Sequence, residues 1–331
     1  MYDLEKEMKK FYYNEVVLPQ EETSNLRKKK KINLDRLKEG LKKYNEENST
    51  DYKIAETIEQ GSVAMSTVIL NDKNDYDIDV AIVFDDTNIG KIGSIAIKNI
   101  IVDALKRKCT NFKKEPEAKT NCVRIEYVDN YHIDFAIYKR IKNEYDDGYK
   151  YEHAGSEWKS RDPRAINNWF KEEIGINGEK LRQAIRLIKT FCKSRESWNM
   201  PGGLIQTVLC DEKIQDYSRI DEMFYYSICE IRDRLKYNKE VYNPTDSSQN
   251  LLLVQEDNDK LENLSNRLNT YISKLNILFD SDCTKEQAKD AWHSFFNHDY
   301  WNTQLNEYLR RLAITYNYYK NSYEYDDTEE F

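Results

Sequence analysis

Residues 60–84 read QGSVAMSTVILNDKNDYDIDVAIVF, and this stretch determines the expected fold. Its second half alternates apolar side chains with Asp77 and Asp79, a spacing that places both carboxylates on one face of a β-strand. Burying an unpaired carboxylate is costly, so two acids on a strand that otherwise consists of core residues require a counter-charge. A divalent cation would supply that charge, and Mg²⁺ prefers oxygen ligands of this kind.

A third carboxylate follows in YHIDFAIYK, residues 131–139, where Asp134 lies between two apolar residues of a second predicted strand. Three acids on adjacent strands can hold two metal ions about 4 Å apart, a clamp that stabilises the attacking and leaving oxygens of an in-line phosphoryl displacement. We therefore predict Asp77, Asp79 and Asp134 as catalytic residues and as ligands of two Mg²⁺ ions, with Mn²⁺ as a substitute.

Gly61 and Ser62 come directly before VAMST, residues 63–67, which we expect to form one helical turn. Glycine lets a phosphate approach the backbone, a hydroxyl donates to a phosphate oxygen, and the free N–H groups of the turn attract anions. A Gly-Ser pair alone is a weak signal. Followed by Asp-x-Asp at 77–79, it predicts a nucleotide phosphate site.

Short β-rich runs dominate residues 54–140, with one helical segment near 93–108. Residues 1–50 have a helical pattern with a polar break at PQEETSN, residues 19–25, after which Ser24 is expected to cap a long helix. Helical periodicity returns after Pro163 and continues to about 320, with loops expected at 200–203 and 243–250.

The predicted fold class is α+β, a mixed sheet with helices followed by a helical lobe. We expect N-terminal helices and an α/β core in residues 1–160, a helical C-terminal lobe in 161–320, and an acidic mobile tail in 321–331.

The net charge of -8 and the isoelectric point near 5.4 argue against a protein whose main function is to bind nucleic acid, because such binding depends on cations that contact phosphates. The one basic run, RKKKK at 27–31, opens a segment with helical spacing of leucines and is interpreted as a solvated helix face. No apolar run reaches the length of a membrane span, the N-terminus lacks a signal-peptide pattern, and the six cysteines form no CxxC pair. We therefore expect a cytoplasmic protein that contacts no membrane and requires no DNA or RNA.

Residues 179–196 form a predicted helix with a cationic stripe. The stripe consists of Arg182, Arg186, Lys189 and Lys193, whereas Leu181, Ala184, Ile188 and Phe191 cover much of the opposite side. A donor triphosphate needs such a counter-charge, so the predicted triphosphate contacts are Arg186, Lys189 and Lys193. A solvated basic face is the alternative for this helix.

These motifs together resemble a known family. QGSVAMSTVI, DYDIDVAIVF, HIDFAIYK, WKSRDPRAINNWF and LRQAIRLIKTF, in this order, are similar to the cGAS/DncV-like nucleotidyltransferases, bacterial synthases of cyclic oligonucleotides within the DNA polymerase β-type superfamily. The resemblance covers about residues 8 to 210. It implies a polymerase β-like core packed on a helical lobe, a bilobed molecule with the active site in the cleft, and nucleotide-binding roles for Gln60, Gly61, Ser62, Thr67 and Lys189.

The resemblance also implies a reaction. Two-metal nucleotidyl transfer from nucleoside triphosphates, most often ATP and GTP, would release pyrophosphate and yield a cyclic di- or trinucleotide. Bacterial members of the family act in anti-phage (CBASS) signalling, where the product switches on a separate effector. Regulatory partner proteins are a further expectation.

The sequence departs from the family pattern at two positions. Ser66 stands where the turn Gly-Ser-x-x-x-Gly-Thr often has its second glycine, and Gly202 stands where a serine often helps to hold the triphosphate. The tightness of the turn is therefore in question, and no phosphate role is assigned to Gly202. The Cys/His insertion through which the animal relative senses DNA has no counterpart, so activation by DNA is not implied.

Two other functions share these motifs. A non-cyclising nucleotidyltransferase that modifies tRNA, protein or oligoadenylate would use the same three acids, although the acidic isoelectric point disfavours an RNA substrate. A catalytically silent nucleotide-binding partner would have no reason to keep three costly carboxylates.

Overall fold

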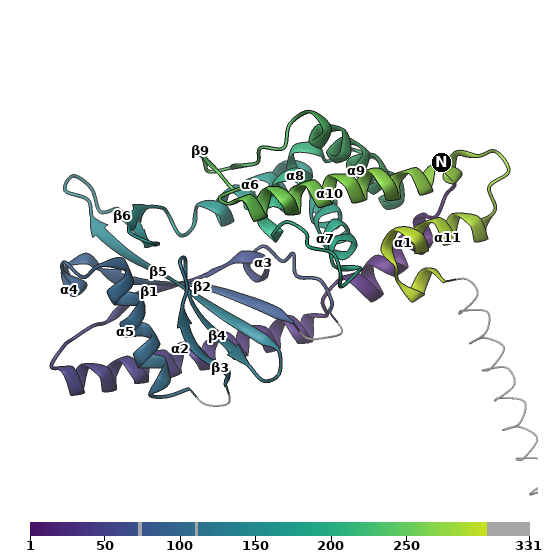
Figure 1. Cartoon of the computed structure of the whole chain (residues 1–331). Coiled ribbons are helices and arrows are strands. Elements are labelled where there is room, and N and C mark those ends of the chain that lie inside the picture. The colour runs from purple at the N-terminus through teal and green to yellow at the C-terminus, as the bar shows by residue number, and fades with distance from the viewer. Residues whose placement is uncertain (72–74, 110–111, 303–331) are drawn as a thin grey trace, which may run out of the picture. The chain divides into compact units, whose positions relative to one another are not determined.

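The computed structural model describes residues 1–71, 75–109 and 112–302 (Figure 1). The chain folds into two compact units. The sheet unit comprises Val17–Arg182 and Tyr242–Gln249, and the helical unit comprises Met1–Val16, Gln183–Val241 and the described residues from Asn250 onward.

This division differs from the expected boundary at 160/161. The sheet unit ends inside helix α7, and the first 16 residues belong to the helical unit. The reason is packing: Phe11 lies with its ring centroid 4.8 Å from that of Phe296, and the backbone N–H of Leu4 donates to Asp221 Oδ2 at 3.0 Å. The expected tail at 321–331 falls outside the described residues.

A seven-stranded mixed sheet forms the centre of the sheet unit, with the order β1-β2-β5-β4-β3 and with β6 beside β5 and β7 beside β6. The central pair β2 and β5 is parallel, and the other pairs are antiparallel. The strands are β1 Ile54–Gln60, β2 Tyr76–Asp85, β3 Phe112–Ala118, β4 Val123–Tyr127, β5 Tyr131–Lys142, β6 Tyr149–Ala154 and β7 Trp158–Ser160. Together with the helices they confirm the predicted α+β class.

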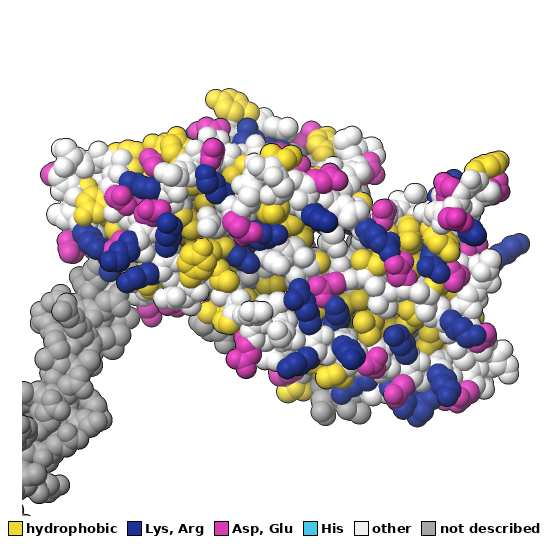
Figure 2. Space-filling view, turned by 180° about the vertical axis from the view of Figure 1, so that it is seen from behind, with side chains coloured by type: hydrophobic (Ala, Val, Ile, Leu, Met, Phe, Trp, Pro, Cys, Tyr) yellow, Lys and Arg dark blue, Asp and Glu magenta, His cyan; other side chains and the backbone are white. Residues whose placement is uncertain are grey.

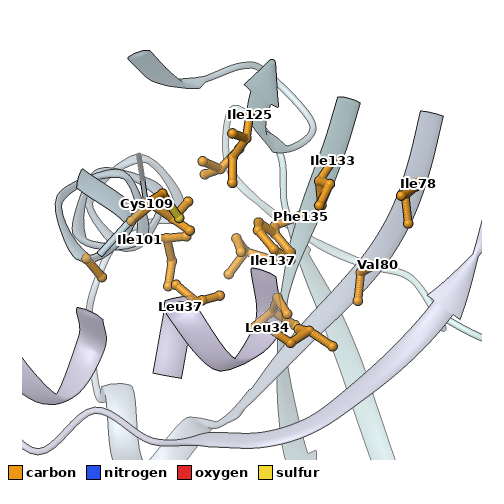
Figure 3. Close-up of a cluster of buried hydrophobic side chains, with 14 of the residues drawn as sticks. Leu34, Leu37, Ile78, Val80, Ile101, Cys109, Ile125, Ile133, Phe135 and Ile137 are labelled. Atoms are coloured by element: carbon orange, nitrogen blue, oxygen red, sulfur yellow. The ribbon is translucent and has the colours of Figure 1, made fainter. Parts of the chain in front are cut away.

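One face of the sheet packs on two helices, α2 (Gln20–Asn48) and α5 (Ser94–Lys106). The alternation in β2 accounts for this face, because Ile78 and Val80 are each 1% exposed and lie in the same core as Leu37 (Figure 3). Further along β2 the second face is buried as well, by a smaller cluster of Ala81, Val83 and Tyr138.

Helix α2 begins earlier than expected, and the predicted cap is wrong. Ser24 lies inside the helix and its hydroxyl donates to the carbonyl oxygen of Gln20 at 2.9 Å. Pro19 has extended backbone before the first turn, where its missing N–H costs nothing, and Glu21 and Glu22 in that turn favour the helix dipole. The other polar stretch, 243–250, was expected to be a loop but forms most of a hairpin of β8 (Tyr242–Asn243) and β9 (Asp246–Asn250).

The remaining short helices of the sheet unit are α3 (Gly61–Ala64), α4 (Asp86–Ile89) and α6 (Ala165–Asn177). The helical unit contains α1 (Glu5–Phe11), a π-helical turn (Tyr12–Val16), most of α7 (Glu179–Lys193), α8 (Gly203–Lys213), α9 (Ile220–Tyr237), α10 (Gln255–Lys274) and α11 (Lys285–Phe296), with 3₁₀ turns at Leu275–Phe279 and Asp299–Trp301. Within the described ranges, no helix combines the length and the hydrophobicity needed to cross a bilayer.

Candidate active site

The three predicted acids lie on the two central strands of the sheet. The parallel register places Asp79 of β2 directly beside Asp134 of β5, and Asp77 beside His132. These side chains occupy the face opposite Ile78 and Ile133, which are buried in the core. The alternation in the sequence therefore brings all three carboxylates to one face of adjacent strands, as expected.

Arg124 supplies a positive charge beside Asp134 and Asp77. It lies on β4 in register with Asp134, and its Nε and Nη2 donate to Asp134 Oδ1 and Oδ2 at 2.8 and 2.7 Å. Its Nη2 is also 3.8 Å from Asp77 Oδ1. Such a fork of two charge-assisted bonds is among the stronger polar contacts in proteins, and it raises the pKa of the Arg124 guanidinium above its usual range.

Arg124 was not among the residues predicted from the sequence, although the register of a predictable hairpin places it beside Asp134. Strands β4 and β5 form a hairpin whose turn contains Asn130 with a φ of +66°, a left-handed conformation that asparagine tolerates. A turn between Tyr127 and Tyr131 fixes the pairing of the two strands. Counting outward from it places Arg124 opposite Asp134.

Asp77 lies in a polar environment that suits a cation. Its pKa is raised because surrounding protein atoms reduce its hydration and the charge of Asp134 adds repulsion, which Arg124 only partly offsets. The Nδ1 of His132 lies 3.5 Å from Asp77 Oδ1 and 3.3 Å from Asp75 Oδ1. The Asp77 side chain is nevertheless 58% exposed, so an ion from solvent can reach it.

Cys122 is a second neighbour that the sequence analysis missed. It directly precedes β4, and burial together with the nearby Asp134 carboxylate raises the pKa of its thiol to about 12. At neutral pH the thiol is therefore protonated.

The donor set fits magnesium, although the side chains must rearrange to hold it. Among the described residues, no group of three or more His, Cys, Asp or Glu side chains converges on one point. Three carboxylates on one face of neighbouring strands are nevertheless the hard oxygen ligands that Mg²⁺ prefers. Because Arg124 donates to both oxygens of Asp134, an ion bound to this carboxylate must share these oxygens with the guanidinium or displace it.

The Gly-Ser turn lies directly against the acids. Gln60, the last residue of β1, pairs with Asp79, and Gly61 follows with a φ of +65°. A Cβ added to Gly61 would lie 1.9 Å from Asp79 Oδ2, so only glycine allows the turn to approach this carboxylate. Ser62 is the second residue of the short helix α3, and its carbonyl oxygen accepts from the N–H of Thr67 at 2.8 Å.

Two other residues predicted to bind nucleotide have structural contacts. The amide Nε2 of Gln60 donates to the carbonyl oxygen of Pro163 at 2.5 Å, which anchors the end of β1. Thr67 is completely buried. In the structure, Gly61 and Ser62 are therefore the members of this group best placed to meet a phosphate.

Ser66 keeps the turn tight despite its departure from the family pattern. Its φ is +54°, the left-handed conformation for which glycine is usually required. For a residue with a Cβ this conformation costs about 1–2 kcal/mol. Arg182 supports the turn through its Nε, which donates to the carbonyl oxygen of Met65 at 3.2 Å.

The rest of the cationic stripe lies on α7 in the helical unit. The predicted apolar side is confirmed, since Leu181, Ala184, Ile188 and Phe191 are all buried. Lys189 is only 9% exposed, so a solvated basic face is the wrong description at this position. A Cβ added to Gly203 would lie 3.6 Å from the Lys189 Nζ, which places the ammonium beside the N-terminus of α8.

The other two cations of the stripe differ from Lys189. Arg186 donates from Nη1 to the Tyr12 hydroxyl at 2.5 Å, and Lys193 is exposed at the end of α7. A buried ammonium next to the positive end of a helix favours an anion more strongly than an exposed lysine does. Lys189 is therefore the best placed of the three to bind a triphosphate.

The basic run at 27–31 is only partly a solvated face. Lys28 and Lys31 are exposed, as interpreted from the sequence. For Lys29 and Lys30 that interpretation is wrong: Lys29 Nζ lies 2.8 Å from Asp129 Oδ2, and Lys30 pairs with Glu59 at the end of β1. On the face shown in Figure 2, Lys and Arg side chains are interspersed with Asp and Glu rather than gathered into one basic patch.

Comparison with known proteins agrees with this geometry. The family model described as the nucleotidyltransferase domain of cyclic GMP-AMP synthase DncV-like proteins matches residues 55–138, which include all but the first residue of β1, the whole of β2, most of β5 and all three acids. A cyclic GMP-AMP synthase of Escherichia albertii is 26% identical over 215 residues, 60% of this chain and 46% of that relative. The match thus spans about half the length of that relative.

Solved structures extend the likeness over both units. The Vibrio cholerae DncV cyclic AMP-GMP synthase, in complex with the linear intermediate 5′ pppA(3′,5′)pG, has a TM-score of 0.68 at 17% identity and covers 89% of this chain and 96% of its own. CdnC of E. coli MS115-1, in complex with HORMA-deltaN, has a TM-score of 0.65 at 15% identity and covers 88% and 96%. At these identities the likeness shows the fold. Together with the family model over the acidic strands and the curated relative, it makes the chain similar to the cGAS/DncV-like nucleotidyltransferases.

Proposed function

We propose that this protein joins nucleoside triphosphates by nucleotidyl transfer, releases pyrophosphate, and closes the product into a cyclic di- or trinucleotide. The observation that carries the proposal is the register of Asp79 with Asp134, with Asp77 on the same face and the Gly61 turn directly against Asp79. The names of the relatives support it, since both the E. albertii protein and the V. cholerae protein are described as cyclic dinucleotide synthases.

Asp77, Asp79 and Asp134 would hold two Mg²⁺ ions, or Mn²⁺ in their place. When bound, such ions lower the pKa of an attacking ribose hydroxyl and stabilise the leaving pyrophosphate. The residues of the chain do the rest. Gly61 lets the turn lie against the Asp79 carboxylate, and the Ser62 hydroxyl and the N–H groups at the start of α3 would donate to phosphate oxygens.

The helical unit would supply positive charge for the donor triphosphate. Lys189 and the N-terminus of α8 form the main contact, with Arg186 and Lys193 adding weaker attraction. A ring requires two transfers, so the linear intermediate must bind again with its ends exchanged. ATP and GTP are the proposed substrates, because V. cholerae DncV was solved with ATP and GTP.

The proposed setting is bacterial anti-phage (CBASS) signalling in the cytoplasm, with a separate effector as the target of the product. A regulatory partner is also proposed, because CdnC was solved in complex with a HORMA protein. No DNA or RNA is required in this proposal, since Lys29 and Lys30 are held by acidic residues and only Lys28 and Lys31 of the lysines in this run remain exposed.

The decisive experiment is to incubate the nuclease-treated protein with Mg²⁺ and each labelled nucleoside triphosphate, treat with phosphatase, and identify the protected product. We expect a phosphatase-resistant ring, absent from the Asp77→Asn/Asp79→Asn variant. Open, phosphatase-sensitive chains would instead identify a non-cyclising nucleotidyltransferase, and nucleotide binding without turnover would identify a silent partner.

Nucleic-acid independence has its own test. The Lys28→Glu/Lys31→Glu variant should keep wild-type activity, because these exposed side chains are the lysines of the run that can be reversed without breaking an internal ion pair. A strict requirement for duplex DNA or RNA, abolished by this reversal and steeply weakened by salt, would refute this part of the proposal.

A further inference from the structure

We propose that Arg124 is a built-in counter-ion of the acidic face that competes directly with the divalent cation and thereby sets the metal affinity of the protein. The inference deepens the proposed function, since it takes Asp77, Asp79 and Asp134 as the metal site. It concerns a residue to which neither the motifs nor the relatives assign a role.

Arg124 lies close to carboxylates on both central strands. Both oxygens of Asp134 accept from Arg124, at 2.8 and 2.7 Å, and the same guanidinium lies 3.8 Å from an oxygen of Asp77. Arg124 thus bridges carboxylates of two different strands, where a shared cation would lie. A metal ion that binds Asp134 must either displace the arginine or share these oxygens with it at close range, so the two cations compete for the negative charge of the same ligand.

The pairing of β4 with β5 fixes the ion pair between Arg124 and Asp134. Residues on both sides of Arg124 are held in the sheet, with Val123 opposite Phe135 and Ile125 opposite Ile133, all four completely buried. The Asp134 side chain is only 14% exposed, so solvent screens this contact less than a typical surface ion pair. The arrangement therefore differs from two flexible side chains that meet by chance.

Three carboxylates on one face repel one another, and Arg124 adds one positive charge beside them. The positive charge of two divalent ions and Arg124 would exceed the negative charge of the three carboxylates by about two units. The phosphates of a bound nucleotide balance this excess. The competition therefore favours metal binding when nucleotide is present and disfavours it when nucleotide is absent.

The test is a measurement of Mn²⁺ affinity without nucleotide, by electron paramagnetic resonance of the free ion. Arg124→Gln should tighten Mn²⁺ binding by about tenfold or more, because a charge-assisted fork no longer has to be broken. Arg124→Lys keeps the charge but loses the fork, and should give an intermediate affinity. An affinity of Arg124→Gln equal to or weaker than wild type would overturn the inference.

Arg140→Gln is the matched control. Arg140 lies further along β5 in register with Asp85 of β2, and its Nε donates to Asp85 Oδ1 at 2.6 Å. The substitution therefore removes an arginine–aspartate bond from the same sheet without touching the three acids, and should leave Mn²⁺ affinity unchanged. An equal gain in both variants would show a general charge effect and also overturn the inference.

A second readout separates competition from a merely structural role. In EDTA, Arg124→Gln should melt at a lower temperature than wild type, because Asp134 and Asp77 then lose the positive charge of Arg124, and Mn²⁺ should raise its melting temperature more than it raises that of wild type. If Mn²⁺ stabilises both proteins equally, Arg124 is a structural residue and the inference fails.

These outcomes also distinguish this inference from the proposed function. If wild type binds Mn²⁺, Asp134→Asn abolishes that binding and Arg124→Gln changes nothing, only the role of Arg124 is refuted. If Asp134→Asn leaves Mn²⁺ binding unchanged, the metal site itself is wrong and the proposed function fails with it.

Discussion

Gly61→Ala offers a quantitative test of the contact between the Gly-Ser turn and the acids. An alanine at a φ of +65° would cost about 1–2 kcal/mol for the left-handed region. Its Cβ would also lie 1.9 Å from Asp79 Oδ2 and 2.7 Å from Asp79 Cγ. Relieving such an overlap in a packed site costs about 1–3 kcal/mol, so we expect a total loss of about 2–5 kcal/mol in the free energy of unfolding.

The two contributions can be separated by urea unfolding of matched variants. Gly178 has the same φ of +65° but nothing within 4 Å of an added Cβ, so Gly178→Ala should lose only the backbone part. In an Asp79→Ala background the overlapping carboxylate is gone, and Gly61→Ala should cost less than it does in wild type. Equal costs in the two backgrounds, or equal losses at Gly61 and Gly178, would refute the close approach.

Three further predictions concern buried polar groups. Burial lowers the pKa of His153 from 6.5 to about 4. The contribution of the neutral imidazole to the unfolding free energy should therefore be complete above pH 6.5 and should fall toward pH 4 by at most about 1.4 kcal/mol per pH unit. Urea midpoints measured across this range should show this slope, and His153→Gln should remove the part that is due to His153. Lys98, 3% exposed, donates to the carbonyl oxygens of residues 119, 120 and 155, and Lys98→Met should lower the unfolding free energy by about 3 kcal/mol, since three carbonyl oxygens lose their charged donor. Lys189→Met should weaken triphosphate binding, measured by calorimetry, by about 1.5–3 kcal/mol, and more than Lys193→Met does; equal effects would restore the solvated description of α7.

The sequence predicted the acidic strands well because a single local pattern specifies them. Alternation in β2 and β5 fixes which face each carboxylate occupies, and the parallel pairing then brings Asp79 beside Asp134. Arg124 was missed for a different reason. The predicted counter-charge was a bound metal ion, whereas in the structure Arg124 of a neighbouring strand supplies it. Its position depends on the register of a hairpin.

Other departures share a cause, which is that local patterns do not reveal tertiary partners. The amphipathic pattern of residues 1–16 predicts one buried face, but only the fold shows that this face packs in the helical unit. The polarity of residues 19–25 suggests a break, although the same residues suit a first helical turn after proline. Lys29 and Lys30 form part of a charged run, yet Asp129 and Glu59 are distant in sequence and pair with them.

Asp77 and Asp79 lie in the part of β2 where only one face of the strand is buried, and both faces are buried further along the strand. Asp77 and Asp79 precede Ala81 and Val83, which lie on the same face and are completely buried. A slip of one residue in the pairing of β2 with β5 would turn both acids toward the main core and expose Ile78 and its apolar neighbours. Burying two unpaired carboxylates there would be far costlier than any local gain from a different pairing. The alternation that builds the core therefore also selects the register in which Asp79 lies beside Asp134, so folding and the assembly of the site depend on the same choice.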